Sequence, residues 1–281
     1  MAKEYLTESS QWCHLSGGTT KAHRLTFATV LVCLGLIPST VFGQQNLFNV
    51  PSSDITEPGE IFFQQQINLL PDLLQFNSTM CYGLGRNFEI GFNIIGLNVN
   101  TQSSSPFIIS NGDIHSPPVY PFYTLNLQKA FVLNRTLRVA VGAQTGLSID
   151  AHFGNYTYTN VITSIPRWHS KIITGIYGST NSFLGPGDRN LFVPEANIGF
   201  QLGLEQPIIR EKLYVIVEGI TGRHSLGSTT LGGAWYVSKH WVVSLGYLFA
   251  NSGSLAVNSL ITELTYVPSI GGHRKVLGHV N

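Results

Sequence analysis

Apolar and polar residues alternate at every second position over most of this chain, and this pattern limits what the chain can fold into. Residues 88–94 place Phe, Ile, Phe and Ile on one face and Glu, Gly and Asn on the other, and residues 197–205 repeat the arrangement. A period of two is that of a β-strand, because successive side chains of a strand point to opposite faces. No segment of about twelve residues beyond residue 58 keeps a helical period, so we expect an all-β fold.

Charged residues are too scarce to cover a surface exposed to water. Of the 281 residues, 43% are hydrophobic and only 11% are charged, whereas a typical soluble domain has about 25% charged residues. Strands closed into a barrel satisfy every backbone donor and acceptor without water, so their apolar faces can contact lipid. The composition therefore favours a transmembrane β-barrel. A secreted soluble β-sandwich, with the same aromatic residues in its core, is the alternative.

About twelve amphipathic segments show the alternation, which predicts an antiparallel barrel of about 12 strands, within a range of about 10–14. The segments are 60–70, 77–85, 88–99, 121–131, 136–149, 154–163, 169–180, 194–206, 212–222, 227–237, 241–250 and 254–267. Segment 154–163 is the weakest of them. Without it the number of strands would be odd and the two chain ends would lie on opposite sides.

The connections between these segments alternate in length. Short turns fall at 86–87, 133–135, 165–167, 207–211 and 238–240, and long stretches rich in Ser, Asn, Pro and Gly fall at 100–120 and 183–194. An even number of antiparallel strands then places both chain ends on the side of the short turns. Outer-membrane barrels have this plan, with short periplasmic turns and longer external loops. The apolar triplet 107–109 in the first long loop could enter the pore or pack on its rim.

The first 43 residues are predicted to be a secretory signal peptide with an extended leader. Basic residues precede an apolar run at 25–37, and Val41 and Gly43 occupy the −3 and −1 positions of a cleavage site. The run is shorter than the roughly 20 residues of a transmembrane helix, although a buried or anchoring helix is an alternative. Cleavage would leave Cys81 as the single cysteine, which excludes an internal disulfide.

Three regions follow the signal peptide. Residues 44–59 are a polar lead-in that either stays periplasmic or enters the lumen as a partial plug. Residues 60–267 form the barrel, and residues 268–281 form a tail that we expect to be disordered. Aromatic residues near the strand ends suit the interfacial girdles of membrane barrels. These residues are Trp168, Trp235, Tyr236, Trp241, Tyr247 and Tyr266.

With its signal peptide, its repeated strand pattern and its closing segment 260–266, the chain resembles bacterial outer-membrane β-barrel proteins. The nearest likeness is to the largely uncharacterised, transporter-like barrels of about twelve strands, and it covers roughly residues 58–267. The resemblance implies a bacterial outer-membrane location, a lipid surrounding and recognition by the outer-membrane assembly machinery. One departure is that such barrels end on an aromatic strand, whereas residues 268–281 follow here.

With the apolar faces outward, the alternating polar residues point into the lumen. The candidate lumen-lining residues are Gln64, Gln66, Asn68, Glu89, Asn93, Asn126, Gln128, Arg138, Gln144, Gln201, Glu205, Glu218 and Glu263. Because the acidic residues outnumber the single basic one, an open lumen would favour cations or neutral polar solutes over anions. Alternatively, Arg138 pairs with one of these glutamates and braces a filled interior, since eight-stranded barrels are filled by side chains.

Glycines also recur on the inward face. They are Gly91, Gly142, Gly199, Gly203, Gly232 and Gly246. Such glycines either widen the lumen or receive a neighbouring Tyr ring and let the sheet curl, and the structural role is the preferred interpretation.

Catalytic motifs are missing from the sequence. Beyond the signal peptide, no His has a Ser two positions later, as an outer-membrane phospholipase would show, and no GxSxG, HExxH or P-loop motif occurs. We therefore expect no enzymatic activity, no cofactor and no metal site. Lys and Arg total 16 against 15 Asp and Glu, so there is no basic excess to bind nucleic acid.

The sequence therefore predicts an outer-membrane channel or transporter-like barrel for the passive passage of small solutes. One alternative is a filled structural or adhesive outer-membrane barrel without transport. The other is a secreted soluble β-sandwich that acts as a binding module.

Overall fold

The computed structural model describes residues 46–268, apart from residues 53, 103–106 and 188–195. Residues 1–45, which include the predicted cleavage site, and all but the first residue of the predicted tail lie outside the described residues. Within the described part of the chain, no helix is both long enough and apolar enough to cross a bilayer.

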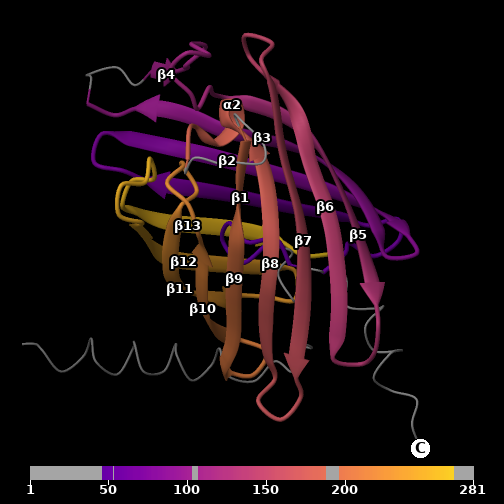
Figure 1. The fold of residues 1–281 in the computed structure, drawn as a ribbon. Coiled ribbons are helices and arrows are strands. Elements are labelled where there is room, and N and C mark those ends of the chain that lie inside the picture. The colour runs from indigo at the N-terminus through magenta and orange to yellow at the C-terminus, as the bar shows by residue number, and fades with distance from the viewer. Residues whose placement is uncertain (1–45, 53, 103–106, 188–195, 269–281) are drawn as a thin grey trace, which may run out of the picture. The chain divides into compact units, whose positions relative to one another are not determined.

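Twelve strands close into an antiparallel barrel, which confirms the predicted fold class (Figure 1). They are β1 (Ile61–Leu69), β2 (Leu73–Gly85), β3 (Phe88–Asn100), β5 (Phe122–Val132), β6 (Leu137–Ser148), β7 (Phe153–Ile165), β8 (Ser170–Thr180), β9 (Ala196–Ile209), β10 (Leu213–Ile220), β11 (Ser228–Tyr236), β12 (Trp241–Ala250) and β13 (Ser259–Tyr266). Each strand pairs with its neighbours in the sequence, and β1 pairs with β13 to close the ring. The weakest predicted strand is the regular strand β7.

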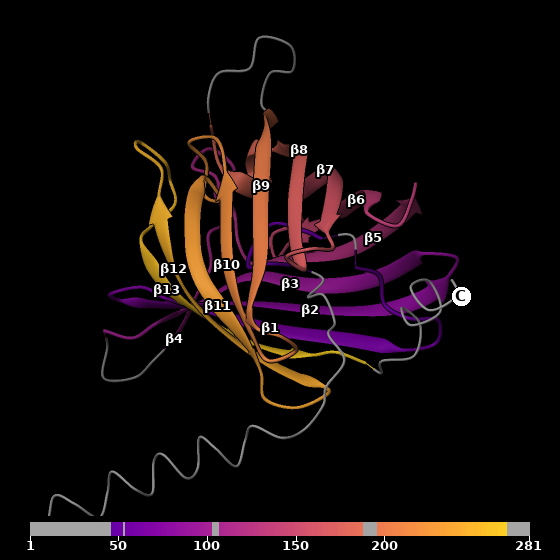
Figure 2. The same ribbon diagram turned by 90° about the horizontal axis from the view of Figure 1, so that it is seen from below.

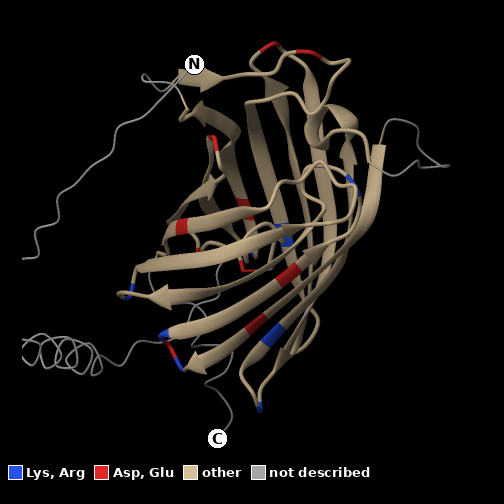
Figure 3. Cartoon of the chain, turned by 90° about the vertical axis from the view of Figure 1, so that its left-hand side faces the viewer, with Lys and Arg blue, Asp and Glu red and all other residues tan. Residues whose placement is uncertain are grey.

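The predicted alternation separates two faces in the structure. Along β12 exposed and buried side chains alternate at every position from Trp241 to Phe249. On β9 the outward residues Ile198, Phe200 and Leu202 are 58%, 68% and 54% exposed, while their neighbours Asn197 and Gln201 are buried. Figures 2 and 3 show the strands wrapped around a common interior, and Figure 3 shows that few charged residues interrupt them.

Of the six aromatic residues expected in the girdles, four are exposed, one is half-buried and one is buried. Trp168, Trp235 and Trp241 are exposed at or beside strand ends. Tyr236, in contrast, is only 9% exposed and packs on Tyr214 inside the barrel, with ring centroids 5.4 Å apart. The alternation along β11 explains the error, because Tyr236 falls on the inward face that the buried Ala234 also occupies.

The apolar triplet 107–109 forms a thirteenth strand, β4 (Phe107–Ile109), instead of entering the pore. It pairs with the last three residues of β3, from Asn98 to Asn100. The β3–β5 ladder stops at Ile95, so β3 has a free edge beyond that point. Backbone groups at a free edge need partners, and β4 supplies them at the rim, on the side of the long loops.

We expect an Arg on the outward face to destabilise the barrel most at mid-strand. Leu202→Arg, in the middle of β9, should cost about 2–4 kcal/mol of folding free energy in a bilayer, whereas the control Ile208→Arg, near the strand end, should cost about 0–1 kcal/mol. Both residues are exposed. Equilibrium unfolding in lipid vesicles measures the two values. Equal costs would contradict lipid contact along this face.

Candidate functional site

The barrel encloses the N-terminal segment of the described chain, residues 46–58, which we call the inner segment. Its apolar residues Leu47, Phe48 and Val50 are 0%, 2% and 0% exposed. Residues 46–52 of the predicted polar lead-in therefore lie in the lumen, which was one of its two expected locations. Its polarity was overestimated, because these three residues form part of the buried core.

Inward glycines make room for the inner segment. A Cβ built at Gly246 would lie 2.7 Å from Cζ of Phe48, and one built at Gly203 would lie 2.3 Å from a methyl carbon of Leu47. A side chain at either position would therefore collide with the inner segment. At two other inward glycines the space is filled by the Tyr ring that the sequence predicted. Tyr158 lies over Gly142, and Tyr177 lies over Gly199.

Glu218 of β10 binds the backbone of the inner segment. Its Oε2 accepts hydrogen bonds from the backbone N–H groups of Phe48, Asn49 and Val50, at 3.1, 2.9 and 3.0 Å. Its Oε1 accepts a further bond from Nδ2 of Asn49 at 2.9 Å. Successive backbone N–H groups form a concave site for an anion. Here that anion is supplied by the barrel wall, and Glu218 is only 2% exposed.

Three other strands hold the next turn of the inner segment. Asn160 of β7 donates to the carbonyl of Pro51 at 2.6 Å. Gln128 of β5 donates to the carbonyl of Ser52 at 3.0 Å. Glu89 of β3 accepts from both the N–H and the hydroxyl of Thr56, at 2.8 and 2.9 Å. The inner segment is therefore bound from several sides of the barrel.

Asp54 joins the inner segment to the cations of the lumen. Its carboxylate lies 2.5 Å from Nζ of Lys171 and 3.3 Å from the guanidinium of Arg138, and Lys171 also lies 3.5 Å from Glu205. The sequence alternative paired Arg138 with a glutamate of the wall, but its carboxylate partner in the structure is Asp54. Lys171 was missed, although it shares the inward face of β8 with Ile173.

Of the thirteen candidate lumen residues, ten are buried and three, Asn126, Arg138 and Gln144, are half-buried. Six of them contact the inner segment directly, namely Gln64, Gln66, Glu89, Gln128, Arg138 and Glu218. Glu205 is linked to it through Lys171. Gln201 bonds to Asn160 and Tyr156, Asn126 donates to Asn93, and Glu263 is buried beside Gln66 in the β1–β13 register.

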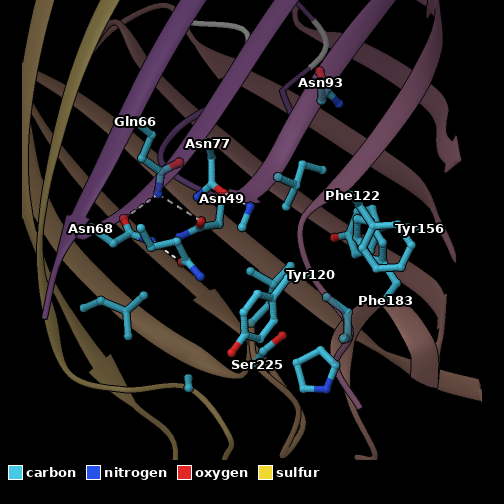
Figure 4. Close-up of a pocket in the computed structure, with 18 of the residues that line it drawn as sticks. Asn49, Gln66, Asn68, Asn77, Asn93, Tyr120, Phe122, Tyr156, Phe183 and Ser225 are labelled. Carbon is cyan, nitrogen blue, oxygen red and sulfur yellow. Dashed lines mark hydrogen bonds between the residues drawn. The ribbon is translucent and has the colours of Figure 1, made fainter. Parts of the chain in front are cut away.

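A cavity of about 230 Å³ remains above the inner segment, on the side of the long loops. Amide side chains of β1–β3, among them Gln66, Asn68 and Asn77, line one wall (Figure 4). Phe122, Tyr156 and Phe183 lie across from them. Phe183 belongs to the short helix α2 (Asn181–Leu184), which packs inward. Phe48 and Asn49 of the inner segment contribute to the floor. We call this space the outer cavity.

The described residues contain no group of three or more His, Cys, Asp or Glu side chains that could hold a metal ion. No protein-family model and no curated protein matches this chain. Among solved structures, the NanC porin in a rhombohedral crystal form is similar, with a TM-score of 0.51 and 5% sequence identity. The match covers 75% of this chain and 100% of the porin chain. The barrel thus has the fold of an outer-membrane porin.

Proposed function

We propose that this protein is an outer-membrane channel for the passive passage of small solutes, closed at rest by its inner segment. The observation that carries the proposal is that the lumen holds a polypeptide segment together with the Phe48 and Leu47 side chains. A barrel that contains a peptide chain has a passage of that width once the segment leaves. Eight-stranded barrels, by comparison, are just filled by their own side chains.

The contacts of the inner segment also indicate the side on which it can leave. Asp54 is bound at Arg138 and Lys171, which lie just after the short turns that precede β6 and β8. Asn46, at the other end, lines the outer cavity. The inner segment therefore extends along the lumen, with Asp54 on the short-turn side and Asn46 near the long loops. Release would withdraw it towards the short turns, which the plan of outer-membrane barrels places in the periplasm.

The number of contacts favours a closed resting state over a leak. Hydrogen bonds to charged groups contribute about 1.5–3 kcal/mol each, and Glu218, Glu89 and Asp54 all take part in such interactions with the inner segment or the wall. The same contacts support the second candidate, a permanently filled barrel with a structural or adhesive role. The two candidates differ only in whether the inner segment can be released while the barrel stays folded.

Planar-bilayer recording of the mature protein tests the proposal. We expect almost no current in plain buffer and discrete, reversible openings in moderate urea, because urea weakens both apolar and peptide contacts. A heat-modifiability gel at the same urea concentration reports whether the barrel is folded. Silence in urea from a folded barrel would support the permanently filled barrel. Extraction from membranes without detergent would contradict the proposed location in the outer membrane.

A further inference from the structure

We propose that the outer cavity binds a small, neutral, polyhydroxylated solute of the size of a monosaccharide. The first observation is the charge of its lining. No Asp, Glu, Lys or Arg occurs among the described residues that line it. Asp54, Glu89 and Glu218 bind at the inner segment, and Glu263 lies beside Gln66 in the β1–β13 register without lining the cavity. A charged solute would lose its hydration in the cavity without gaining an opposite charge, which is unfavourable.

The amide wall of the outer cavity forms a hydrogen-bonded chain. Gln66 donates to Asn68 at 2.9 Å, and Asn68 donates to Gln75 at 2.9 Å. Gln66 also lies within 3.4 Å of the side-chain oxygen of Asn49 in the inner segment. Each side-chain amide has two donors and an acceptor with two lone pairs, so the chain retains capacity for solute hydroxyl groups. An apolar solute would leave these groups unpaired, and burial without a partner costs about 1–3 kcal/mol for each group.

The opposite wall is aromatic. The ring centroids of Phe122 and Phe183 are 4.9 Å apart, and those of Tyr156 and Phe183 are 6.5 Å apart. The hydroxyl of Tyr156 already donates to Gln201 at 2.8 Å, so its ring, more than its hydroxyl, is what the side chain offers the cavity. Figure 4 shows these rings facing the amides across the cavity. A solute with hydroxyl groups on its edges and C–H groups on one face matches both walls at once.

The size of the outer cavity and its floor also favour a bound solute. Its volume of about 230 Å³ is below the range of roughly 300–1,000 Å³ that is usual for drug-sized ligands. Phe48 and Asn49 close it from below, so a solute that arrives from the long-loop side would stop there. Binding therefore does not require the inner segment to move, and a barrel that never conducts would bind the same solute.

Isothermal titration calorimetry of the folded mature protein tests this inference. An amine-oxide detergent is needed, because the sugar headgroup of a maltoside would compete for the cavity. We expect glucose to bind at least about tenfold more tightly than glucuronate or glucosamine, which carry a negative and a positive charge. Gln66→Leu should weaken glucose binding by about tenfold. The matched control Gln65→Leu changes the preceding residue of β1, which faces away from the lumen, and should leave binding unchanged.

A second variant separates the cavity from the inner segment. Gln75→Leu removes an amide that belongs to the wall and accepts from Asn68, and we expect the same loss as for Gln66→Leu. A heat-modifiability gel confirms that each variant is folded. Equal binding of glucose and its charged analogues, no binding of glucose, or unchanged affinity in both folded variants would each overturn the inference. None of these results bears on the conductance experiment, so the two proposals can fail separately.

Discussion

Glu218→Leu is expected to convert the closed barrel into a conducting channel. The change removes the carboxylate that accepts three consecutive backbone N–H groups and the side-chain amide of Asn49. Leaving a buried donor without a partner costs about 1–3 kcal/mol. Three orphaned backbone donors therefore favour withdrawal of residues 48–50 into water. Single-channel recording should show a high probability of opening without urea.

Two further variants give reference values for the opening probability of Glu218→Leu. Glu218→Gln retains one acceptor oxygen, so its opening probability should fall between those of the wild type and Glu218→Leu. A chain that lacks residues 46–57 sets the level of the fully open state. Thr230→Val is the control, because Thr230 is buried opposite Glu218 in the register of β10 and β11. If Glu218→Leu is folded and silent while the deletion variant conducts, Glu218 does not hold the inner segment.

Gly246→Val is expected to expel the Phe48 side chain from its place against the inner face of the barrel wall. A Cβ at residue 246 would lie 2.7 to 3.1 Å from three ring carbons of Phe48 and would meet nothing else as close. Valine itself suits a strand, so the wall should tolerate the change while the inner segment does not. We expect frequent openings and faster proteolysis of residues 46–58. Gly219→Val is the matched control, because a Cβ there would only approach Thr229, at 3.9 Å.

A double mutant distinguishes this collision from general damage to the strand. Phe48→Ala alone should also open the channel, because removing a buried Phe side chain costs about 3–5 kcal/mol. In Gly246→Val/Phe48→Ala the valine occupies space that the ring has left. The double mutant should therefore lower the free energy of channel opening by less than the sum of the changes that the two single mutants cause. If the two free-energy changes add exactly, the valine at position 246 does not act through the Phe48 side chain.

The strands could be predicted from the sequence because their signal is local. Alternation at period two needs only a few neighbouring residues, and it located both faces of β3 and β9 correctly. Tyr236 was wrongly expected at the membrane interface because it is a tyrosine near a strand end. The alternation along β11 instead indicates that its side chain is buried. Lys171 was omitted from the expected lumen residues, although the alternation along β8 places it on the inward face with Ile173.

The arrangement inside the barrel could not be predicted in the same way, because it depends on distant pairs. Lys171 and Asp54 are 117 residues apart, and Glu218 and Phe48 are 170 residues apart. Which wall residue meets the inner segment depends on the register of many strand pairs, and nothing near residue 48 in the sequence encodes that. The short apolar group at residues 47, 48 and 50 was the one available signal that this lead-in is buried.

The position of the inner segment has a consequence for biogenesis. Residues 46–58 precede all the described strands, so in the proposed export to the outer membrane they would leave the translocon ahead of every wall residue that binds them. Glu89 follows Thr56 by 33 residues, but Glu218 follows Phe48 by 170. Contacts of such long sequence separation form slowly. In the proposed outer-membrane location, the inner segment would therefore be among the last parts of the chain to gain its contacts, and its apolar side chains would stay available to periplasmic chaperones until the barrel has closed.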